Sequence, residues 1–357
     1  MAQAGRPALT SEPRSGAPVG VLYTGGTFGM TRSPRGYTPS TDLPARADAA
    51  LAAGAGPRLP PLEWIPFAED APINSSDATP RLWFELAEAI AAHADRCAGF
   101  VVIHGTDTLA FTGAALSFLL AGLGKPVVVT GAAAPLGEDG SDAADNLRHA
   151  LRVAAGGRIA EVAVAFGRHL LRANRATKRH GDTRDIFTSP GLEPLARLGP
   201  RIRYRQQPAL TPGAPTLLPR AHWCDTRVAL LPAYPGLSGD LVRATCATGV
   251  GALLIEGYPA GVAPGGDAGF VAAVAEAVGA GTVVGAVSQS RHGWIRMGRY
   301  AISTPLAEAG MVGGEDMTRE AALTKLHYLL ASRNSPEARA RDFARDLAGE
   351  LTPLQAA

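Results

Sequence analysis

Two segments of the chain place threonine behind glycine at the end of a short apolar run. The run Val19–Tyr23 is followed by TGGT, which ends at Thr27. The run at residues 100–103 is followed by HGTDT, which contains Thr106 and Asp107. A threonine hydroxyl is a weak nucleophile at neutral pH and needs a neighbouring base. The two segments therefore predict covalent catalysis by a threonine, activated by the nearby carboxylate or by a buried lysine of lowered pKa.

Each segment taken alone also fits a simpler role. TGGT is typical of a tight turn or of a general phosphate-binding turn after a strand. It matches neither GxGxxG nor the P-loop, and Gly124-Lys125 is followed by Pro126, so the nucleotide-binding motifs fail. Asp107 could cap the next helix, and His104 fits a packing role better than the role of a base. The two segments together are less easily explained as turns.

The scaffold around these segments follows from alternating strand-like and helical patterns. Four short valine-rich runs are typical of strands buried on both faces: Val19–Tyr23, residues 100–103, Val127–Thr130 and Val162–Phe166. Helices are expected after Thr79, after Thr108 and after Ser141-Asp142, where the last pair could cap the helix. Such alternation implies a parallel sheet, in which ligands bind beyond the carboxyl ends of the strands, where Thr27 and Thr106 fall.

A proline-rich stretch divides the chain. We interpret residues 206–225 as a linker between an N-terminal catalytic domain at 19–205 and a C-terminal domain at 226–357, with a disordered tail at 1–18. The second domain repeats the pattern, with strands expected near residues 228–231, 252–255 and 282–286 and helices near 240–248, 267–278 and 318–331. The predicted fold class is α/β, with a larger N-terminal and a smaller C-terminal parallel-sheet domain and helices on both faces.

Composition argues against several classes of protein. The 357 residues include 46% hydrophobic and 18% charged residues, which is typical of a globular protein large enough for two domains. A net charge of +2 with scattered arginines gives no reason to expect nucleic acid or a membrane surface as partner. Three widely spaced cysteines without a CxxC pair argue against disulfides and zinc. With no signal-peptide pattern and no membrane-spanning run, we expect a cytoplasmic protein.

The motifs resemble, in order and spacing, those of the bacterial L-asparaginase family, and most closely its cytoplasmic type I branch. The resemblance rests on YTGGTFGM at 23–30, NSSD at 74–77 and HGTDT at 104–108. Further similar segments lie at 124–127, 130–132, 141–147, 177–178, 234–236 and 316–326. The similarity runs from about Val19 to Pro353, and the two threonine motifs together are highly specific.

The resemblance implies a cofactor-free amidohydrolase that converts L-asparagine to L-aspartate and ammonia through an acyl-enzyme, with glutamine a weaker substrate. Carried over by motif, Thr27 would be the nucleophile, and Tyr37 on the lid after the first strand would shape its proton transfer. Thr106, Asp107 and Lys178 would form a second cluster of hydroxyl, carboxylate and ammonium. Lys178 would relay a proton while Asp107 holds it in place, which is the logic of a catalytic triad built from other side chains.

The resemblance also implies how the substrate is held. The expected substrate-binding residues are Ser75, Ser76, Gly105, Thr106, Asp107 and Ala132. The two serines would hold the α-carboxylate, Asp107 would pair with the α-ammonium, and the Ala132 carbonyl would accept from the leaving amide. Family members build this site between neighbouring subunits, so a homodimer or homotetramer is expected.

Three of these assignments have simpler alternatives. Tyr37 could be a solvated loop residue, and Lys178 could be a surface charge. Ser75 and Ser76 could precede the next helix as capping residues.

The chain departs from the type I pattern after the strand that ends at Glu256. Type I relatives often carry YGVGN there, whereas this chain has YPAGV, which ends at Val262 and lacks the asparagine. The arginine and cysteine of a regulatory asparagine site in some relatives are replaced by Glu256 and Ser290. Because Glu256 would repel a substrate carboxylate, we expect no allosteric control by asparagine.

Two other functions remain open. One is a non-catalytic amino-acid-binding protein, against which the retained Thr27, Thr106, Asp107 and Lys178 argue. The other is the asparaginase-like subunit of a tRNA-dependent amidotransferase, which normally carries an extra N-terminal module for which the 18-residue tail leaves no room. A nucleotide-binding module is a more distant alternative.

Overall fold

The computed structural model describes residues 16–54, 57–67, 72–181, 185–206, 210, 220–259 and 262–352. Most of the expected tail (residues 1–15), most of the expected linker (207–209 and 211–219), residues 260–261 and Pro353 lie outside this part of the chain. The chain forms two compact units. The N-terminal unit runs to Ala173 and also includes Lys178–Thr188 and Pro194–Leu217. The C-terminal unit contains Asn174–Thr177, Ser189–Glu193 and the chain from Leu218.

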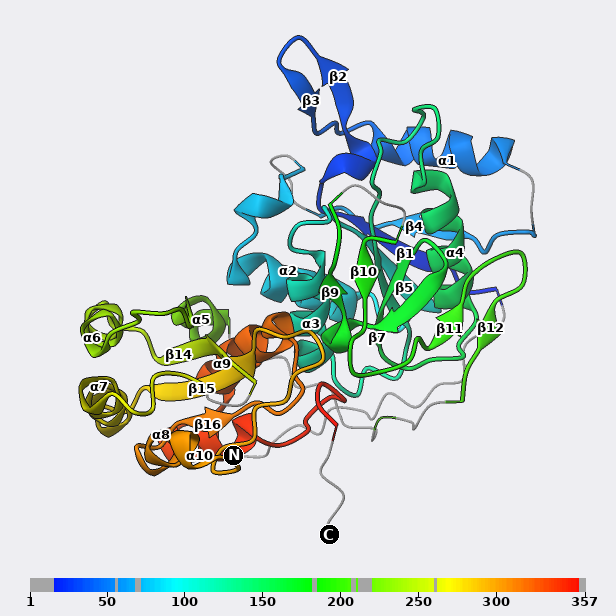
Figure 1. Cartoon of the computed structure of the whole chain (residues 1–357). Coiled ribbons are helices and arrows are strands. Elements are labelled where there is room, and N and C mark those ends of the chain that lie inside the picture. Colours follow the sequence, from blue (N-terminus) through cyan, green and yellow to red (C-terminus); the bar gives the residue numbers. More distant parts are fainter. Residues whose placement is uncertain are drawn as a thin grey trace, which may run out of the picture. The chain divides into compact units, whose positions relative to one another are not determined.

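An eight-stranded sheet forms the centre of the N-terminal unit, in the order β12-β11-β8-β7-β6-β5-β1-β4 (Figure 1). The strands are β1 (Val19–Tyr23), β4 (Leu62–Trp64), β5 (Gly99–Ile103), β6 (Val127–Thr130), β7 (Val162–Phe166), β8 (His169–Arg172), β11 (Ala196–Arg197) and β12 (Arg203–Tyr204). Strands β4, β1, β5, β6 and β7 are parallel, and β8, β11 and β12 add an antiparallel edge. The predicted α/β class is confirmed, although the antiparallel edge was not expected.

Helices cover both faces of this sheet. They are α1 (Leu43–Ala53), α2 (Pro80–Ala92), α3 (Leu109–Leu119) and α4 (Ala143–Ala155). Helices α1 and α4 share one apolar cluster with Val21 and Val101 of the sheet. Helix α3 approaches the other face, where its Gly113 packs near Val164 of β7. Helix α2 begins at Pro80 after its N-cap Thr79, as the sequence predicted.

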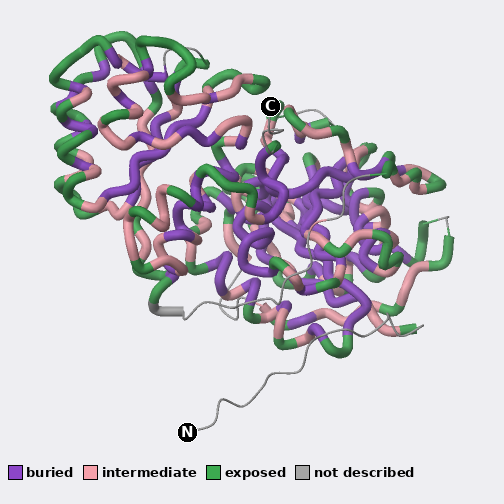
Figure 2. The backbone as a smooth tube through the Cα atoms, turned by 90° about the horizontal axis from the view of Figure 1, so that it is seen from below, coloured by how far each residue is buried: buried purple, intermediate pink, exposed green. Residues whose placement is uncertain are grey.

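Burial follows this layering. Figure 2 shows long buried stretches of the tube, whereas other parts alternate between buried and exposed residues. Every residue of β5, β6 and β7 is buried, which explains why their sequences are almost purely apolar. The loops at the carboxyl ends of these strands therefore emerge from a fully buried part of the sheet.

The C-terminal unit has a four-stranded parallel sheet in the order β13-β14-β15-β16. Its strands are β13 (Val228–Pro232), β14 (Ala252–Gly257), β15 (Val283–Ser288) and β16 (Val312–Gly313). Its helices are α5 (Arg220–Cys224), α6 (Gly239–Ala247), α7 (Ala268–Gly279), α8 (Thr304–Glu308), α9 (Arg319–Ser332) and α10 (Pro336–Phe343). Leu253 of β14 joins Phe270 of α7 in one cluster, and Leu254 joins Leu326 of α9 and Phe343 of α10 in another. Helices therefore cover both faces, as predicted, although α5, α8 and α10 were not expected.

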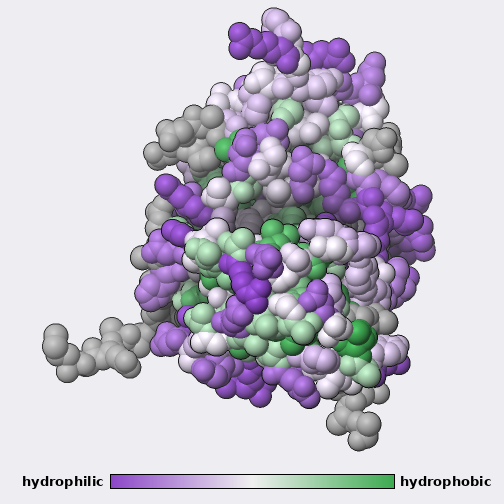
Figure 3. Space-filling view, turned by 60° about the vertical axis from the view of Figure 1, so that its left-hand side comes forward, coloured by the Kyte–Doolittle hydropathy of each residue, from purple (hydrophilic) through white to green (hydrophobic). Residues whose placement is uncertain are grey.

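The surface is mixed in polarity. On the face shown in Figure 3, hydrophilic residues are widespread and hydrophobic residues gather in small groups. Among the described helices, none combines the length and the apolar character needed to cross a bilayer.

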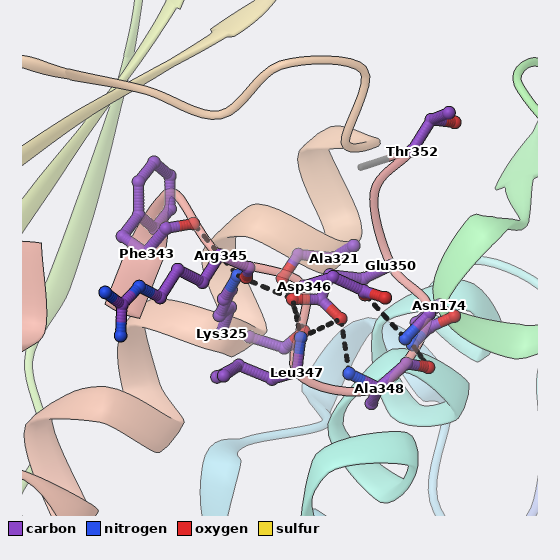
Figure 4. Close-up of polar contacts among 12 residues, drawn as sticks. Asn174, Ala321, Lys325, Phe343, Arg345, Asp346, Leu347, Ala348, Glu350 and Thr352 are labelled. Atoms are coloured by element: carbon purple, nitrogen blue, oxygen red, sulfur yellow. Dashed lines mark hydrogen bonds and ion pairs between the residues drawn. The ribbon is translucent and has the colours of Figure 1, made fainter. Parts of the chain in front are cut away.

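A buried ion pair lies within the C-terminal unit (Figure 4). The side chains of Lys325 and Glu350 are both 0% exposed, and Nζ lies 2.5 Å from Oε1. The Lys325 ammonium also donates to the carbonyls of Phe343 and Arg345, and the Glu350 carboxylate accepts the N–H of Ala348 at 2.7 Å. Two buried charges are tolerated here because each has its partner and additional hydrogen bonds.

Asp346 lies beside this pair and gives the unit a predicted pH dependence. Burial, reinforced by the negative charge of Glu350, raises the pKa of Asp346 to about 6. In the unfolded chain this carboxyl loses its proton at lower pH, so the stability of the fold falls as pH rises from about 4 to about 6. The Asp346→Asn variant avoids this loss. Calorimetry measures the melting temperature of Asp346→Asn minus that of wild type. This difference is expected to become more positive as pH is raised from 4 to 7. Asp225→Asn, at an exposed position, is the control, and a difference independent of pH would contradict the assignment.

Candidate active site

The two threonine segments lie side by side at one edge of the N-terminal sheet. Strands β1 and β5 are adjacent and parallel, with Tyr23 opposite Ile103 at their carboxyl ends. The turn that carries Thr27 and the turn that carries Thr106 therefore begin at the same level. This is the position at which parallel α/β sheets bind ligands.

Glycine allows three backbone segments to meet at this edge. A Cβ atom on Gly26 would lie 2.2 Å from the Gly105 Cα, and one on Gly105 would lie 2.5 Å from the Ser75 Oγ. Gly25 has a φ of 125° and packs against the backbone of Ile73, with which it forms an isolated parallel bridge. Any side chain at these glycines would push the segments apart. The glycines thus place the first threonine motif, the second motif and Ser75 in direct contact.

Thr27 opens a short 3-10 turn (Thr27–Gly29) immediately after the two glycines. The residue is half-buried, and its carbonyl accepts the N–H of Met30 at 3.1 Å. Within the described part of the chain its hydroxyl has no hydrogen-bond partner. The hydroxyl is therefore available to a substrate, but none of the described residues supplies a base in contact with it.

The second expected cluster is assembled. The Lys178 Nζ donates to the Thr106 Oγ1 at 3.0 Å and to the Asp107 Oδ1 at 2.6 Å. The Lys178 side chain is 23% exposed, which argues against a simple surface charge, while the Asp107 side chain is 61% exposed. An ammonium at this distance stabilises negative charge that develops on the threonine oxygen and can exchange a proton with it.

Tyr37 lies away from this cluster. It belongs to a hairpin of β2 (Thr31–Ser33) and β3 (Gly36–Thr38), here called the lid hairpin, which projects from the N-terminal unit in Figure 1. The Tyr37 hydroxyl donates to the Glu138 Oε2 at 2.7 Å, and the Arg32 Nε donates to the Oε1 of the same carboxylate at 3.0 Å. The hydrogen bond to Glu138 raises the pKa of Tyr37. The structure thus pairs Tyr37 with Glu138 and does not bring it to Thr27.

The two expected serines differ in exposure. Ser75 is 2% exposed and Ser76 is exposed, both in a short 3-10 turn (Ser75–Asp77). The N-cap of α2 is Thr79, so neither serine caps that helix. The Thr108 Oγ1 donates to the Ser75 carbonyl at 2.7 Å, which ties this turn to the second threonine motif.

Asp142 has a role that the sequence did not indicate. We expected it to cap α4, and it occupies the N-cap position, but its side chain makes no capping hydrogen bond. Its carboxylate instead accepts the N–H groups of Ala133 at 2.9 Å and Ala134 at 3.2 Å. Asn146, one turn later, donates to both Asp142 and the Gly131 carbonyl. The pair fixes the loop after β6, which carries the buried Ala132. The sequence signal for this role was an aspartate and an asparagine four residues apart at the start of an expected helix.

His104 supports the site without titrating in the physiological range. It is fully buried, and burial lowers its pKa to about 4. The Trp83 indole donates to the Thr112 hydroxyl, which lies 2.9 Å from the His104 Nε2, while Nδ1 lies 2.8 Å from the Gly105 carbonyl. Since a carbonyl can only accept, Nδ1 carries the proton of the neutral ring. The burial and the hydrogen bonds of His104 fit the predicted packing role better than the role of a base.

The described residues contain no group of three or more histidines, cysteines, aspartates or glutamates that could hold a metal ion.

Comparison with known proteins defines the class to which this fold and site belong. Residues 18–210 match the family model described as "Asparaginase, N-terminal", and residues 227–343 match "Glutaminase/Asparaginase C-terminal domain". The chain therefore belongs to the asparaginase family.

Within this family the chain is similar to type I proteins, which confirms the resemblance noted in the sequence. It is 43% identical over 337 residues to L-asparaginase 1 of Escherichia coli K12, a match that covers 93% of this chain and 97% of the relative. The crystal structure of L-asparaginase I from Vibrio cholerae superimposes with a TM-score of 0.81 at 34% identity, covering 94% of this chain and 99% of that one. L-Asparaginase of Thermococcus kodakarensis gives a TM-score of 0.82 at 30% identity, covering 94% and 100%.

Proposed function

We propose that this protein is an L-asparaginase that hydrolyses L-asparagine to L-aspartate and ammonia. Family membership over almost the whole chain supports this function. The observation that carries it is the cluster of Thr106, Asp107 and Lys178 beside the glycine turn that presents Thr27. A threonine hydroxyl without a partner among the described residues, near a second hydroxyl held by an ammonium, favours catalysis over simple binding of amino acids.

The proposed reaction proceeds through a covalent ester. The Thr27 Oγ bonds to the side-chain amide carbon of asparagine as the hydroxyl loses its proton. The carbon–nitrogen bond then breaks, and the nitrogen leaves as ammonia after gaining a proton. Water attacks the resulting ester, releases aspartate and returns a proton to Thr27. Lys178 stabilises charge on Thr106 and relays protons, and Asp107 keeps the ammonium in place.

The substrate's α-groups would be held by neighbouring segments. Ser75 and Ser76 are assigned to the α-carboxylate, and the exposed carboxylate of Asp107 to the α-ammonium. Gly105 and Thr106 would form the adjoining wall of the site. The Ala132 carbonyl, on the loop fixed by Asp142, would accept from the leaving amide.

Tyr37 is assigned to proton transfer at Thr27, and this requires the lid hairpin to move. In this structure Tyr37 is 45% exposed and bonded to Glu138. Closure would exchange that hydrogen bond for a contact with Thr27. Loops that close over a bound substrate are a common way to exclude water and complete a catalytic site.

We further propose a cytoplasmic homodimer or homotetramer without asparagine regulation. The Glu256 carboxylate is held by Arg319, with Nη1 3.3 Å from Oε2, and its side chain is 15% exposed. A carboxylate here disfavours binding of a second asparagine through its own carboxylate. Val262 is buried, and Ser290 stands where some relatives have cysteine.

The proposal is tested by ammonia release from the purified protein. L-Asparagine, L-glutamine, D-asparagine and buffer alone are compared up to millimolar concentration. We expect hyperbolic dependence on L-asparagine and slower release from L-glutamine. Asparagine binding in calorimetry without ammonia release would contradict the proposal and support a non-catalytic binding protein.

A further inference from the structure

Arg46 of α1 contacts two backbone segments of the proposed site at once. Its Nη1 donates to the Gly29 carbonyl at 3.1 Å, and its Nη2 donates to the Leu136 carbonyl at 2.7 Å. Gly29 ends the short turn that Thr27 begins, and Leu136 lies on the loop that carries Ala132. We propose that Arg46 is a positioning residue that holds the nucleophile and the leaving-group acceptor in register. This inference rests on the proposed function, from which the roles of Thr27 and Ala132 come.

The same two segments also bond directly to each other. The Leu136 N–H donates to the Phe28 carbonyl at 3.0 Å, and Phe28 is fully buried. Together with the two Arg46 contacts, this forms a closed set of hydrogen bonds among α1, the Thr27 turn and the Ala132 loop. Such a set resists relative movement of the three segments better than a single hydrogen bond does, because a shift that lengthens one of the bonds also strains the others.

Arg46 also closes the base of the lid hairpin. The chain leaves the Thr27 turn at Gly29, forms the lid hairpin and returns at the start of α1, which carries Arg46. The hydrogen bond from Arg46 to Gly29 joins two residues 17 positions apart and so connects the two stems. The lid hairpin can therefore move, as the role of Tyr37 requires, while the turn that presents Thr27 stays in place.

An ordinary ion pair does not explain these contacts. The nearest carboxylate, on Asp42, lies 3.3 Å from Nη1 and is 58% exposed, and exposed pairs of this kind contribute little. Burial raises the pKa of the nearby Tyr23 to about 12, so that phenol stays neutral and provides no counter-charge. The guanidinium is therefore held mainly by its hydrogen bonds to the carbonyls of Gly29 and Leu136. Arginine suits them because its N–H groups have a fixed spacing, whereas a lysine ammonium acts as a point donor.

The expected consequence is a loss of turnover rather than of binding. The substrate's α-carboxylate and α-ammonium are assigned to Ser75, Ser76 and Asp107, none of which contacts Arg46. A shift of the Thr27 turn against the Ala132 loop misaligns the attacking oxygen and the leaving nitrogen. Misplacement on the order of 1 Å costs about 100-fold in rate.

The test compares three variants in ammonia release and in hydrogen exchange. Arg46→Met is expected to lower kcat for L-asparagine about 10- to 100-fold with KM changed less than about threefold. A lysine at this position reaches one carbonyl at a time. The kcat of Arg46→Lys is therefore expected to lie between those of Arg46→Met and wild type. Arg152→Met is the matched control, because Arg152 also bridges two carbonyls, those of Gly199 and Pro200, at 2.9 Å each. It is expected to keep wild-type kcat.

Hydrogen exchange separates this inference from the proposed function. The Leu136 amide and the amides of residues 28–30 are expected to exchange faster in Arg46→Met and not in Arg152→Met. If wild type releases no ammonia but this difference is seen, the proposed function fails and the structural clamp stands. If wild type is active and Arg46→Met matches it in kcat and in exchange, the inference is overturned. Equal losses of kcat in Arg46→Met and Arg152→Met also overturn it, because they indicate general destabilisation. If Arg46→Met does not fold, the Arg46→Lys variant decides, and a wild-type kcat in that variant overturns the inference.

Discussion

Replacing Thr27 by alanine is expected to lower kcat for L-asparagine by about 10⁴-fold or more while asparagine still binds. The hydroxyl has no hydrogen-bond partner among the described residues, so its removal breaks no structural contact. What is lost is the atom that forms the ester. Ammonia release measures the rate, and calorimetric binding of L-asparagine shows that the site remains.

Two further variants make this prediction specific. Thr27→Ser keeps a hydroxyl and is expected to retain part of the activity. Thr24→Val removes the other hydroxyl of the TGGT turn, which donates to the Ile103 carbonyl at 3.1 Å. The Thr24 N–H also donates to this carbonyl at 3.0 Å, so the carbonyl stays paired and activity within about tenfold of wild type is expected. Wild-type turnover in Thr27→Ala would remove Thr27 from the mechanism.

The largest effect on stability is expected at the buried pair of the C-terminal unit. Lys325→Met leaves the Glu350 carboxylate without its counter-ion at 0% exposure. Breaking a buried pair from one side costs about 3–5 kcal/mol of unfolding free energy. Denaturant titration monitored by circular dichroism measures this loss. Arg243→Met, which breaks an exposed pair with Glu276 in the same unit, is expected to change stability little.

A double replacement measures how much of the lost stability comes from the interaction between Lys325 and Glu350. In Lys325→Met/Glu350→Gln both charges are gone, so the loss is expected to be smaller than the sum of the two single losses. Additive losses would show that the two charges do not depend on each other, contrary to the 2.5 Å contact.

The sequence predicted the parts of the fold that local patterns determine. Strands β5, β6 and β7 are buried on both faces, so their apolar runs were visible without tertiary information. Strands β11 and β12 have two residues each, and three of these four are arginine or tyrosine. Such strands are defined by their neighbours and not by their own pattern. Helix α10 is short and polar, and its capping residue Ser335 was its main local signal.

The candidate site depended more on long-range information. Spacing alone brought Thr27 and Thr106 to the same sheet edge, but Lys178 entered through family resemblance. Its partner Asp107 is 71 residues away, and no periodicity connects them. The link between Tyr37 and Glu138 spans 101 residues and depends on where the lid hairpin rests, which a motif does not encode.

The segment that precedes Lys178 has a consequence for synthesis of the chain. Asn174–Thr177 belongs to the C-terminal unit, where Arg175 is 2% exposed and bonds to Asp316 and to the Glu350 carbonyl. These partners are 141 and 175 residues further along the chain. During translation Arg175 is therefore synthesised well before Asp316, the carboxylate with which it pairs. The contacts of this segment within the C-terminal unit can therefore form only after the chain up to Glu350 has been synthesised.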